Sequence, residues 1–466
     1  MNLFIRLSAC ACLLFTASFI GMSPVYSASY TPASNACVAS LDWFKKPSFP
    51  SEVPDGGTTN CNFQQFSWQS FIAAVQPTGE KTPQGGILEF ESWMPSYGIF
   101  VEKGQQPTPW GQQPDLPNSE CVAVANKKQV SRFFRDNPTG SRLNSNATDQ
   151  AGSNQPLLDL QGNFVFYDIS VNKKSYDFIT ACELFKSNCA SSLKFNGEGI
   201  NLPASLAFPA ASAELKTAWM IMTKELDKNL FYRSFGNVVN PDTNKCEHVE
   251  LGLVGMHLVI NTDKHPEFIW ATFEHRNNVP NCADRKAKPP LGGEWNFFNP
   301  ECLGAHCQLN TYSPSHPGQI CRTNPEGSPS NTMGMSKEQI AASKRNRENI
   351  ISINTSVQDF VRGNPKLIDS IWTNYEMTGN VWTLNGILPP TGGRQGVQRG
   401  SLSAANAVME TYLQDGLAEV NPQFNCFGCH TTGFGKPPAG LSHIFDEVVP
   451  MTGGCENGKL PASCPQ

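Results

Sequence analysis

The sequence predicts an α+β fold in which a β-rich central body with long loops is followed by a helical C-terminal part. Strand-like apolar runs gather between residues 213 and 280, and helical periodicity begins at residue 336. Glycine (38) and proline (35) are frequent enough to predict extensive loops around a packed centre. The 466-residue chain is therefore divided into a signal peptide (1–27), a disulfide-stapled body (28–335) and a helical region (336–466).

Residues 1–27 have the features of an export signal. A short positive start precedes the apolar stretch Ala11 to Met22, and Val25-Tyr26-Ser27 offers small residues for cleavage before Ala28. A lipoprotein-like box ending at Cys10 lies ahead of the apolar stretch, which argues against lipidation. Since no apolar run is long enough for a confident span, we expect a periplasmic or secreted protein without stable membrane insertion.

The body is predicted to contain two helices and several strands, three of which form its centre. Apolar residues at three-to-four spacing predict the helices, and alternation or continuous apolar runs predict the strands. The helices are Phe63 to Val75 and Tyr176 to Lys186. The strands are Ile87 to Met94, Gly162 to Ile169, Ala213 to Met222, Val249 to Ile260 and Glu267 to His275. The strand at Val249 is apolar enough to be buried on both faces.

A sharp change in composition separates the body from the helical region. Residues from Cys282 to Ser336 are rich in Pro, Gly, Asn, Ser and Cys, which predicts a loop stapled by disulfides. Helical patterns follow at Lys337 to Arg362, at Leu367 to Tyr375 and at about Ser403 to Leu417. No internal repeat interrupts this order.

Cysteine usage agrees with export. Of 16 cysteines, two lie in the signal and two in the segment Cys426-Phe-Gly-Cys429-His430. The even remainder favours disulfides among Cys37, Cys61, Cys121, Cys182, Cys189, Cys246, Cys282, Cys302, Cys307, Cys321, Cys455 and Cys464. Close spacing makes Cys182 with Cys189, and Cys455 with Cys464, the best local pairs.

The segment from Cys426 to His430 is a c-type haem attachment motif. Two cysteines three positions apart can each form a thioether to one haem vinyl group, and the next histidine is then aimed at the iron. In a cysteine-rich exported chain the same cysteines could instead form a redox pair, join separate disulfides, or bind zinc with His430 and a fourth ligand. The export signal and the Gly/Pro-rich residues after His430 favour one covalent haem c, with Cys426 and Cys429 attached and His430 axial.

The sixth iron ligand stays open. Met451 and His443 are the nearest downstream methionine and histidine, while a ligand from the central body or an open site are the other options. Methionine would raise the reduction potential, a second histidine would lower it, and an open site would permit small-ligand chemistry.

A second group of potential ligands lies at residues 247–276. There His257 and His275, with Glu274, are candidates for a metal site or an acid/base pair beside the haem; the competing interpretation is core histidines held by hydrogen bonds. Strand alternation places His248, Glu250 and Gly252 on one face and His257 on the other, unless a bulge intervenes. His306 between Cys302 and Cys307 suggests zinc, but a disulfide is the better interpretation.

Several segments together resemble a bacterial family of exported, cytochrome c-like proteins with one haem-attachment site near the C-terminus. They are FSWQSFIAAV, LEFESWM, LKTAWMIM, GLVGMHLVINTDKHPEFIWATFEHRNNVP, SIWTNYEMTGNVWTLNG, AANAVMETYLQ and NCFGCH, over roughly residues 60–450. The resemblance implies haem c binding through Cys426, Cys429 and His430. It also suggests that His257 and the Phe273-Glu274-His275 block belong to the same functional unit, but it implies no particular reaction.

The function predicted from these observations is one-electron transfer by a periplasmic monohaem c-type cytochrome with a redox partner protein. The alternatives are a haem-dependent oxidoreductase of peroxidase or oxidase type, with an open distal site and a small-molecule substrate, or a haem-containing sensor or binding module. The net charge of −5 and the lack of a basic run argue against nucleic acid as a partner.

Overall fold

The computed structural model describes most of the chain beyond residue 35. The described residues are 36–82, 85–101, 105–114, 132–134, 151, 155–194, 201–240, 243, 245–302, 304–327, 337–389, 397–403, 405–414, 426–431, 436–446, 451, 453–455 and 459–465. The predicted signal peptide and Cys121 lie outside them, as does most of the loop between residues 107 and 161.

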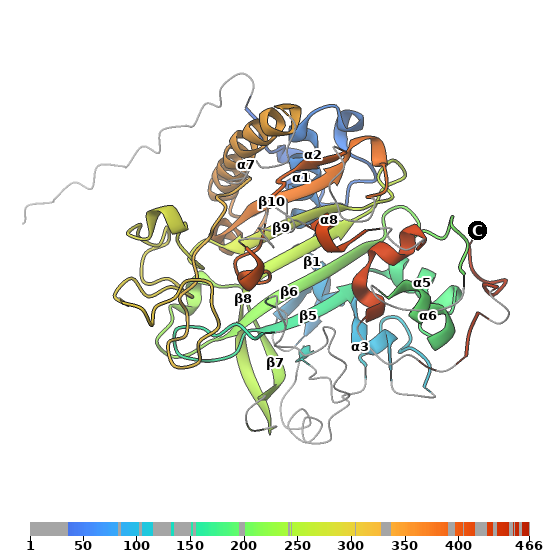
Figure 1. Ribbon diagram of the computed structural model, residues 1–466, viewed down its shortest axis with the longest axis horizontal. Coiled ribbons are helices and arrows are strands. Elements are labelled where there is room, and N and C mark those ends of the chain that lie inside the picture. Colours follow the sequence, from blue (N-terminus) through green and yellow to red (C-terminus); the bar gives the residue numbers. More distant parts are fainter. Residues whose placement is uncertain are drawn as a thin grey trace, which may run out of the picture.

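A large antiparallel sheet organises the molecule (Figure 1). Within the described residues, nine strands join it, in the order β11-β10-β9-β8-β6-β5-β3, with β7 paired to β8 and β4 paired to β7. Its strands are β3 Met94–Pro95, β4 Arg132–Phe134, β5 Phe166–Val171, β6 Ala213–Ile221, β7 Arg233–Asn240, β8 Lys245–Ile260, β9 Ile269–His275, β10 Tyr375–Thr383 and β11 Gln398–Gly400. A separate hairpin consists of β1 Pro77–Thr82 and β2 Gly85–Leu88. The three predicted central strands are confirmed as β6, β8 and β9.

Helices lie around this sheet. The α-helices are α1 Leu41–Lys45, α2 Asn60–Ala74, α3 Ser96–Ile99, α5 Lys173–Ala181, α6 Ser187–Leu193, α7 Lys337–Gly363 and α8 Cys426–Cys429. The 3₁₀ turns are Pro54–Gly57, Glu89–Ser92, Lys228–Leu230, Cys282–Asp284, Ser370–Asn374, Leu384–Gly386, Thr411–Leu413, Pro438–Leu441 and His443–Asp446. None of the helices in the described residues combines the length and apolar character needed to cross a membrane.

One face of the sheet packs against α2 and α7. Their apolar residues, among them Phe71 of α2 and Ile353 of α7, share one buried cluster with Leu215 of β6 and Phe273 of β9. The indole N–H of Trp68 in α2 donates to Asn354 of α7 at 2.9 Å, which joins the two helices. Thr59 caps α2 by accepting from the Asn62 backbone N–H, so the predicted helix begins slightly earlier than expected.

The other face is covered by segments from the C-terminal part of the chain (Figure 1). Apolar residues of the sheet such as Val259 and Trp270 cluster here with Phe427, Ile444 and Phe445. Strands β10 and β11 also come from beyond residue 336, so the sheet itself draws on both predicted regions. The predicted haem-attachment motif, Cys426 to His430, therefore lies over the opposite sheet face from α2 and α7.

The predicted helix at Ser403 to Leu417 is wrong for the described residues 403 and 405–414. They form turns and the short 3₁₀ segment Thr411–Leu413. Side chains of β9 take the backbone groups that a helix would pair internally, since the Ala407 N–H donates to Glu274 at 2.9 Å. The strand expected at Ile87 to Met94 is also wrong in part, because Glu89–Ser92 forms a 3₁₀ turn between β2 and β3.

The disulfides correct the local pairing expected from spacing. Cys182 is bonded to Cys464 and Cys189 to Cys455, so both bridges join the α5–α6 region to the end of the chain. The predicted pairs Cys182–Cys189 and Cys455–Cys464 do not form, because α5 and α6 lie against the C-terminal residues and each of their cysteines faces a partner there. The other described bridges are Cys37–Cys61, Cys282–Cys321 and Cys302–Cys307, and Cys246 is also disulfide-bonded.

The two long-range bridges are expected to substitute for each other. With Cys189–Cys455 intact, breaking Cys182–Cys464 opens only the seven residues from 182 to 189 and the nine from 455 to 464. C182S/C464S should therefore lower the free energy of unfolding by about 3 kcal/mol, and C189S/C455S by a similar amount. The quadruple serine variant opens a loop of more than 250 residues as well and should lose roughly 8 kcal/mol. Guanidinium denaturation followed by tryptophan fluorescence measures this; a quadruple loss equal to the sum of the two doubles would contradict mutual substitution.

Candidate functional site

The predicted haem-attachment motif, Cys426 to His430, forms one helical turn against the sheet. The His430 N–H donates to the Cys426 carbonyl at 2.9 Å, so the turn of α8 extends to His430. Phe427 is fully buried, and the edge of its ring meets Trp270 of β9 with the centroids 6.2 Å apart. Cys426 is half-buried, and the side chain of Cys429 lies outside the described part of the structure. Phe427 thus anchors the turn to β9.

The imidazole of His430 is held in one tautomer. Its Nδ1 lies 2.6 Å from the Leu441 carbonyl oxygen, and because a carbonyl only accepts, Nδ1 carries the proton. The lone pair is then on Nε2. Metal-binding histidines are oriented by the same kind of hydrogen bond from the nitrogen that does not bind. The site therefore presents Nε2 of His430 as its ligand atom.

Two rings enclose this imidazole. The ring centroid of Trp270 lies 4.1 Å away, and the ring of His443 stacks at 3.8 Å. Burial holds the pKa of His430 well below its usual range, and the neighbouring His443 lowers this pKa further. His430 is thus neutral at physiological pH, which is the form that binds a metal.

The sheet beneath the motif carries polar side chains on one face. Lys216 of β6 pairs with His257 of β8, and His257 pairs with Thr272 of β9, so the three share this face. Both His257 and Lys216 lie near enough to His430 to lower its pKa. Strands β6 and β8 therefore bring basic side chains to a site that is otherwise lined by aromatic rings.

A bulge in β8 places His257 there. The pairing shifts from Ala218↔Gly255 to Trp219↔Leu253, which leaves Val254 without a counterpart on β6. The extra residue puts His257 on the same face as Gly252. Simple alternation predicts that His257 and Gly252 lie on opposite faces. The bulge therefore places His257 on the sheet face that the motif covers.

His257 forms an acid/base pair with Glu410. The His257 Nε2 lies 2.8 Å from Glu410 Oε1, and the Asn406 N–H donates to the second carboxylate oxygen at 2.8 Å. Burial would raise the pKa of Glu410, but His257 and Lys216 outweigh it and lower this pKa below its usual range. The side chains of His257 and Glu410 remain 16% and 24% exposed. A charged carboxylate thus faces an imidazole that solvent can reach.

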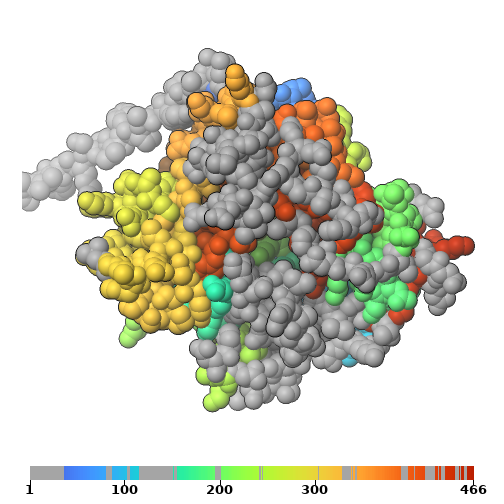
Figure 2. Space-filling view, viewed as in Figure 1, coloured from blue at the N-terminus to red at the C-terminus, as the bar shows by residue number. Residues whose placement is uncertain are grey.

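Glu214 supports the segment that flanks His430. The Ser442 hydroxyl donates to Glu214 Oε2 at 2.6 Å, and Ser442 stands between Leu441, which accepts from His430, and His443, which stacks on it. Burial raises the pKa of Glu214 to about 7, and the hydrogen bond from Ser442 opposes that rise. Green atoms of the central strands are visible in a hollow of this molecular face, beside red atoms of the C-terminal segments (Figure 2).

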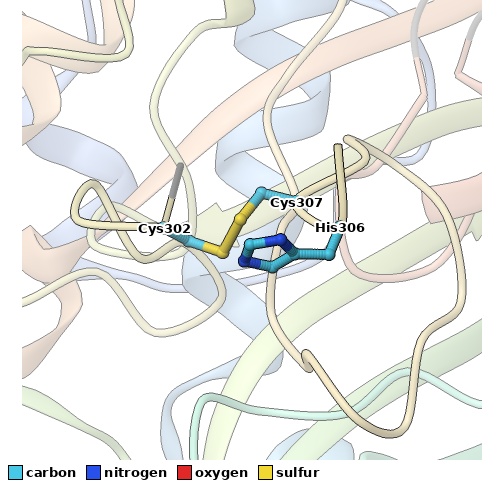
Figure 3. A group of neighbouring side chains, drawn as sticks. All are labelled: Cys302, His306 and Cys307. Carbon is cyan, nitrogen blue, oxygen red and sulfur yellow. A yellow bond between two sulfur atoms is a disulfide. The ribbon is translucent and has the colours of Figure 1, made fainter. Parts of the chain in front are cut away.

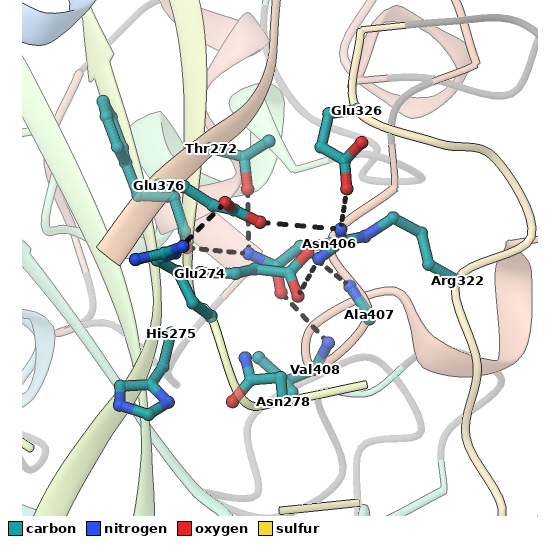
Figure 4. Close-up of polar contacts among 12 residues, drawn as sticks. Thr272, Glu274, His275, Asn278, Arg322, Glu326, Glu376, Asn406, Ala407 and Val408 are labelled. Atoms are coloured by element: carbon teal, nitrogen blue, oxygen red, sulfur yellow. Dashed lines mark hydrogen bonds and ion pairs between the residues drawn. The ribbon is translucent and has the colours of Figure 1, made fainter. Parts of the chain in front are cut away.

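Glu274 belongs to a separate ionic cluster. Its carboxylate lies 3.0 Å from Arg322, which also contacts Glu326 at 2.5 Å and Glu376 at 3.8 Å (Figure 4). Arg322 is only 5% exposed, and the second Glu274 oxygen accepts from Ala407. The cluster joins the stapled loop to β9, β10 and the segment that carries Glu410.

His275 is a core histidine held by hydrogen bonds, which is one of the two interpretations that the sequence left open, and it does not join His257 in one site. Its Nε2 donates to the Leu230 carbonyl at 2.9 Å, and its Nδ1 accepts from the Asn277 N–H at 3.3 Å. The ring is fully buried, stacks on Phe231 at 4.2 Å, and points away from the ionic cluster (Figure 4). Burial lowers its pKa to about 4, so it is neutral at physiological pH.

The two candidates for the sixth ligand, which the sequence left open, occupy different places. His443 stacks on His430, whereas Met451 accepts from the Ser187 N–H through its carbonyl at 2.6 Å and meets Gln106 through its sulfur at 3.8 Å. Met451 is thus engaged beside α6. The position of His443 shortly after the motif points to this segment. The roles of Trp270, Glu410 and Glu214 have no sequence signal, because each depends on contacts between segments far apart in the chain.

Comparison with known proteins gives no family assignment for the chain. No family model, no curated protein and no solved structure matches it.

Proposed function

We propose that this protein is an exported monohaem c-type cytochrome that transfers single electrons to or from a redox partner protein. Cys426 and Cys429 would hold one haem c through thioethers, and His430 would be its axial ligand. The observation that carries the proposal is the neutral His430 imidazole, whose Nδ1–H is bound to the Leu441 carbonyl beside the turn that holds the two cysteines. Disulfides throughout the described residues support maturation in an oxidising compartment.

The surrounding residues fit a haem. Phe427 and Trp270 supply apolar, aromatic surface next to the axial histidine. Lys436, six residues after His430, has a buried Nζ without a hydrogen-bond partner among the described residues. A haem propionate would give this ammonium group a carboxylate partner. Burial lowers the pKa of Lys436, and Asp446 opposes this effect, so the cation gains from a further negative charge.

The bound iron would supply a one-electron couple between its ferric and ferrous forms. The chain supplies the rest. Leu441 fixes the tautomer and direction of His430, Trp270 and Phe427 exclude water, and Ser442 holds the flanking segment through Glu214. His443 is our choice for the sixth ligand because it lies in the segment that holds His430 through the Leu441 carbonyl. Its ring would have to leave the stack with His430 to bind the iron from the other side of the haem.

A haem-dependent oxidoreductase is the second candidate, and the pairing of His257 with Glu410 favours it. An imidazole held by a carboxylate and reached by solvent is suited to proton transfer. This pair lies on the same sheet face as Trp270, against which His430 packs. In this case the iron would keep one position free for a small-molecule substrate.

Haem attachment is tested on protein produced with the c-type maturation machinery. Acid–acetone extraction should leave the pigment on the polypeptide, and the intact mass should show one porphyrin adduct. C426S/C429S should lose the adduct, while C302S/C307S should keep it. Extraction of all pigment from the native chain, or a mass without adduct, overturns the proposal.

Carbon monoxide binding separates the carrier from the oxidoreductase. The ferrous protein should bind no carbon monoxide if His443 fills the sixth position, and H443A should then bind it rapidly, with M451A as the matched control that stays unreactive. Rapid binding by the native protein contradicts the carrier. Peroxide reduction by the native protein should in that case fall about 10²–10⁴-fold in H257A.

A further inference from the structure

The stapled loop that follows β9 carries a second group of potential ligands. Cys302 and Cys307 form a disulfide near the exposed end of this loop, and the His306 ring lies beside the two sulfur atoms (Figure 3). One ligand atom from each of these three residues lies within 4.8 Å of the others. The ring of His316 lies 4.6 Å from that of His306 between centroids. Two sulfurs and two imidazoles are therefore gathered in one place.

These four groups form the ligand set that zinc prefers. Two thiolates and two neutral imidazoles bind Zn²⁺ tetrahedrally, with Zn–S distances of about 2.3 Å and Zn–N distances of about 2.0 Å. The disulfide now occupies both sulfurs, and a disulfide sulfur does not replace a thiolate. His306 and His316 are exposed, so a metal ion can reach them from solvent. Zinc binding at this place therefore requires only that the Cys302–Cys307 disulfide be reduced.

This bond is the one that a reductant should reach most easily among the described disulfides. It closes a separation of only five residues, against 24, 39, 266 and 282 for the others. A short loop restricts the unfolded chain least, so its bridge adds least to stability. Neither of its cysteines is buried, whereas Cys182, Cys189, Cys455 and Cys464 all are. Exposed disulfides of low stabilising value are the labile ones.

We propose that the reduced form of the Cys302–Cys307 bond, together with His306 and His316, is a binding site for a divalent metal ion of the zinc class. A protein dithiol would supply the two electrons and two protons that convert the disulfide to two thiols, and would itself become a disulfide. Binding of the metal then releases the two thiol protons. Such a dithiol must also act on this chain if Cys426 and Cys429 are to be available as thiols for haem attachment. The site itself does not depend on the haem.

The test uses the full-length, haem-loaded protein and Co²⁺ as a spectroscopic probe for Zn²⁺. Limiting dithiothreitol is applied and removed without oxygen, and alkylation with mass spectrometry confirms that Cys302 and Cys307 alone are reduced. We expect one Co²⁺ per chain, with the visible bands of a tetrahedral dithiolate site, and displacement by one Zn²⁺. The oxidised protein should bind at least 100-fold more weakly.

Two variants test the ligands. C302S/C307S, treated in the same way, should show no thiolate bands, and H306A/H316A should bind Co²⁺ at least tenfold more weakly while retaining both thiols. Equal uptake by the oxidised and reduced proteins overturns the proposal, as does full-strength binding by H306A/H316A. Since haem content is measured on the same samples, loss of haem and loss of the metal site are distinguished.

Discussion

Replacement of Arg322 by methionine should lower the free energy of unfolding by about 3–5 kcal/mol. Methionine keeps much of the side-chain volume but removes the cation that faces Glu274, Glu326 and Glu376. Glu274 is fully buried, so its carboxylate cannot recover this interaction from water. Breaking a buried ion pair by removing one partner typically costs this amount. Urea denaturation at pH 8 measures the loss.

The loss should shrink in acid. Burial already raises the pKa of Glu376 to about 7, although Arg322 opposes this rise, so removal of Arg322 leaves carboxyl groups that take up protons more readily. At pH 5 the variant can neutralise them by protonation, which offsets part of the cost. R285M, at an exposed position of the same loop, is the control and should change stability by less than about 0.5 kcal/mol. Equal effects of R322M and R285M would show that the cluster carries no stability.

R322M should also loosen the segment that carries Glu410. Glu274 accepts from both Arg322 and the Ala407 N–H, so the cluster connects the stapled loop with residues 405–414. R322M/E274Q removes the unpaired charge but keeps an acceptor for Ala407, and it should recover part of the loss. The same contact opposes the predicted helix in this segment, because the Ala407 N–H that a helix would pair internally is bound by Glu274 of the sheet.

Regular elements with strong local patterns could be predicted from the sequence. The apolar runs of β6, β8 and β9 and the periodicity of α7 are confirmed, because burial in a sheet or against α2 requires those patterns locally. The predicted bounds of β6 and α7 agree within one residue, whereas β8 begins four residues earlier than predicted. The stapling of the loop after Cys282 is also confirmed. Composition alone was enough there.

The arrangement of the site depends on contacts between distant residues. A single extra residue, Val254, decides which face His257 takes, and no local pattern marks it. Glu410 lies 153 residues after its partner His257, and Ser442 lies 228 residues after its partner Glu214. The pairing of Cys182 with Cys464 is equally remote, so short spacing misled the local assignment. Site residues can be predicted from the sequence when they are neighbours in the chain, as in a motif. The residues that pack around them from distant segments cannot.

Replacement of Glu214 by glutamine should stabilise the protein more at pH 8 than at pH 5. The quantity compared is the free energy of unfolding of E214Q minus that of the native protein at each pH. Burial raises the pKa of Glu214 to about 7 from an ordinary value of 4.5, so the folded chain holds this proton more tightly than the unfolded chain. Between these two pH values the unfolded state binds fewer protons, and the free energy of unfolding therefore falls as the pH rises. A full shift of this size corresponds to about 3 kcal/mol; partial exposure of Glu214 reduces our expectation to about 2 kcal/mol.

The difference between the two stability curves isolates Glu214. His275, with its pKa lowered to about 4, makes stability rise with pH between about 4 and 6.5, and Glu376 contributes in the same direction as Glu214. Both are common to the native protein and E214Q, so their effects cancel in the difference. E294Q, at an exposed carboxyl group, should stay within about 0.5 kcal/mol of the native protein at every pH. Parallel curves for the native protein and E214Q would mean that Glu214 is ionised throughout. A charged carboxylate, rather than a neutral one, would then hold Ser442 and the segment that orients His430.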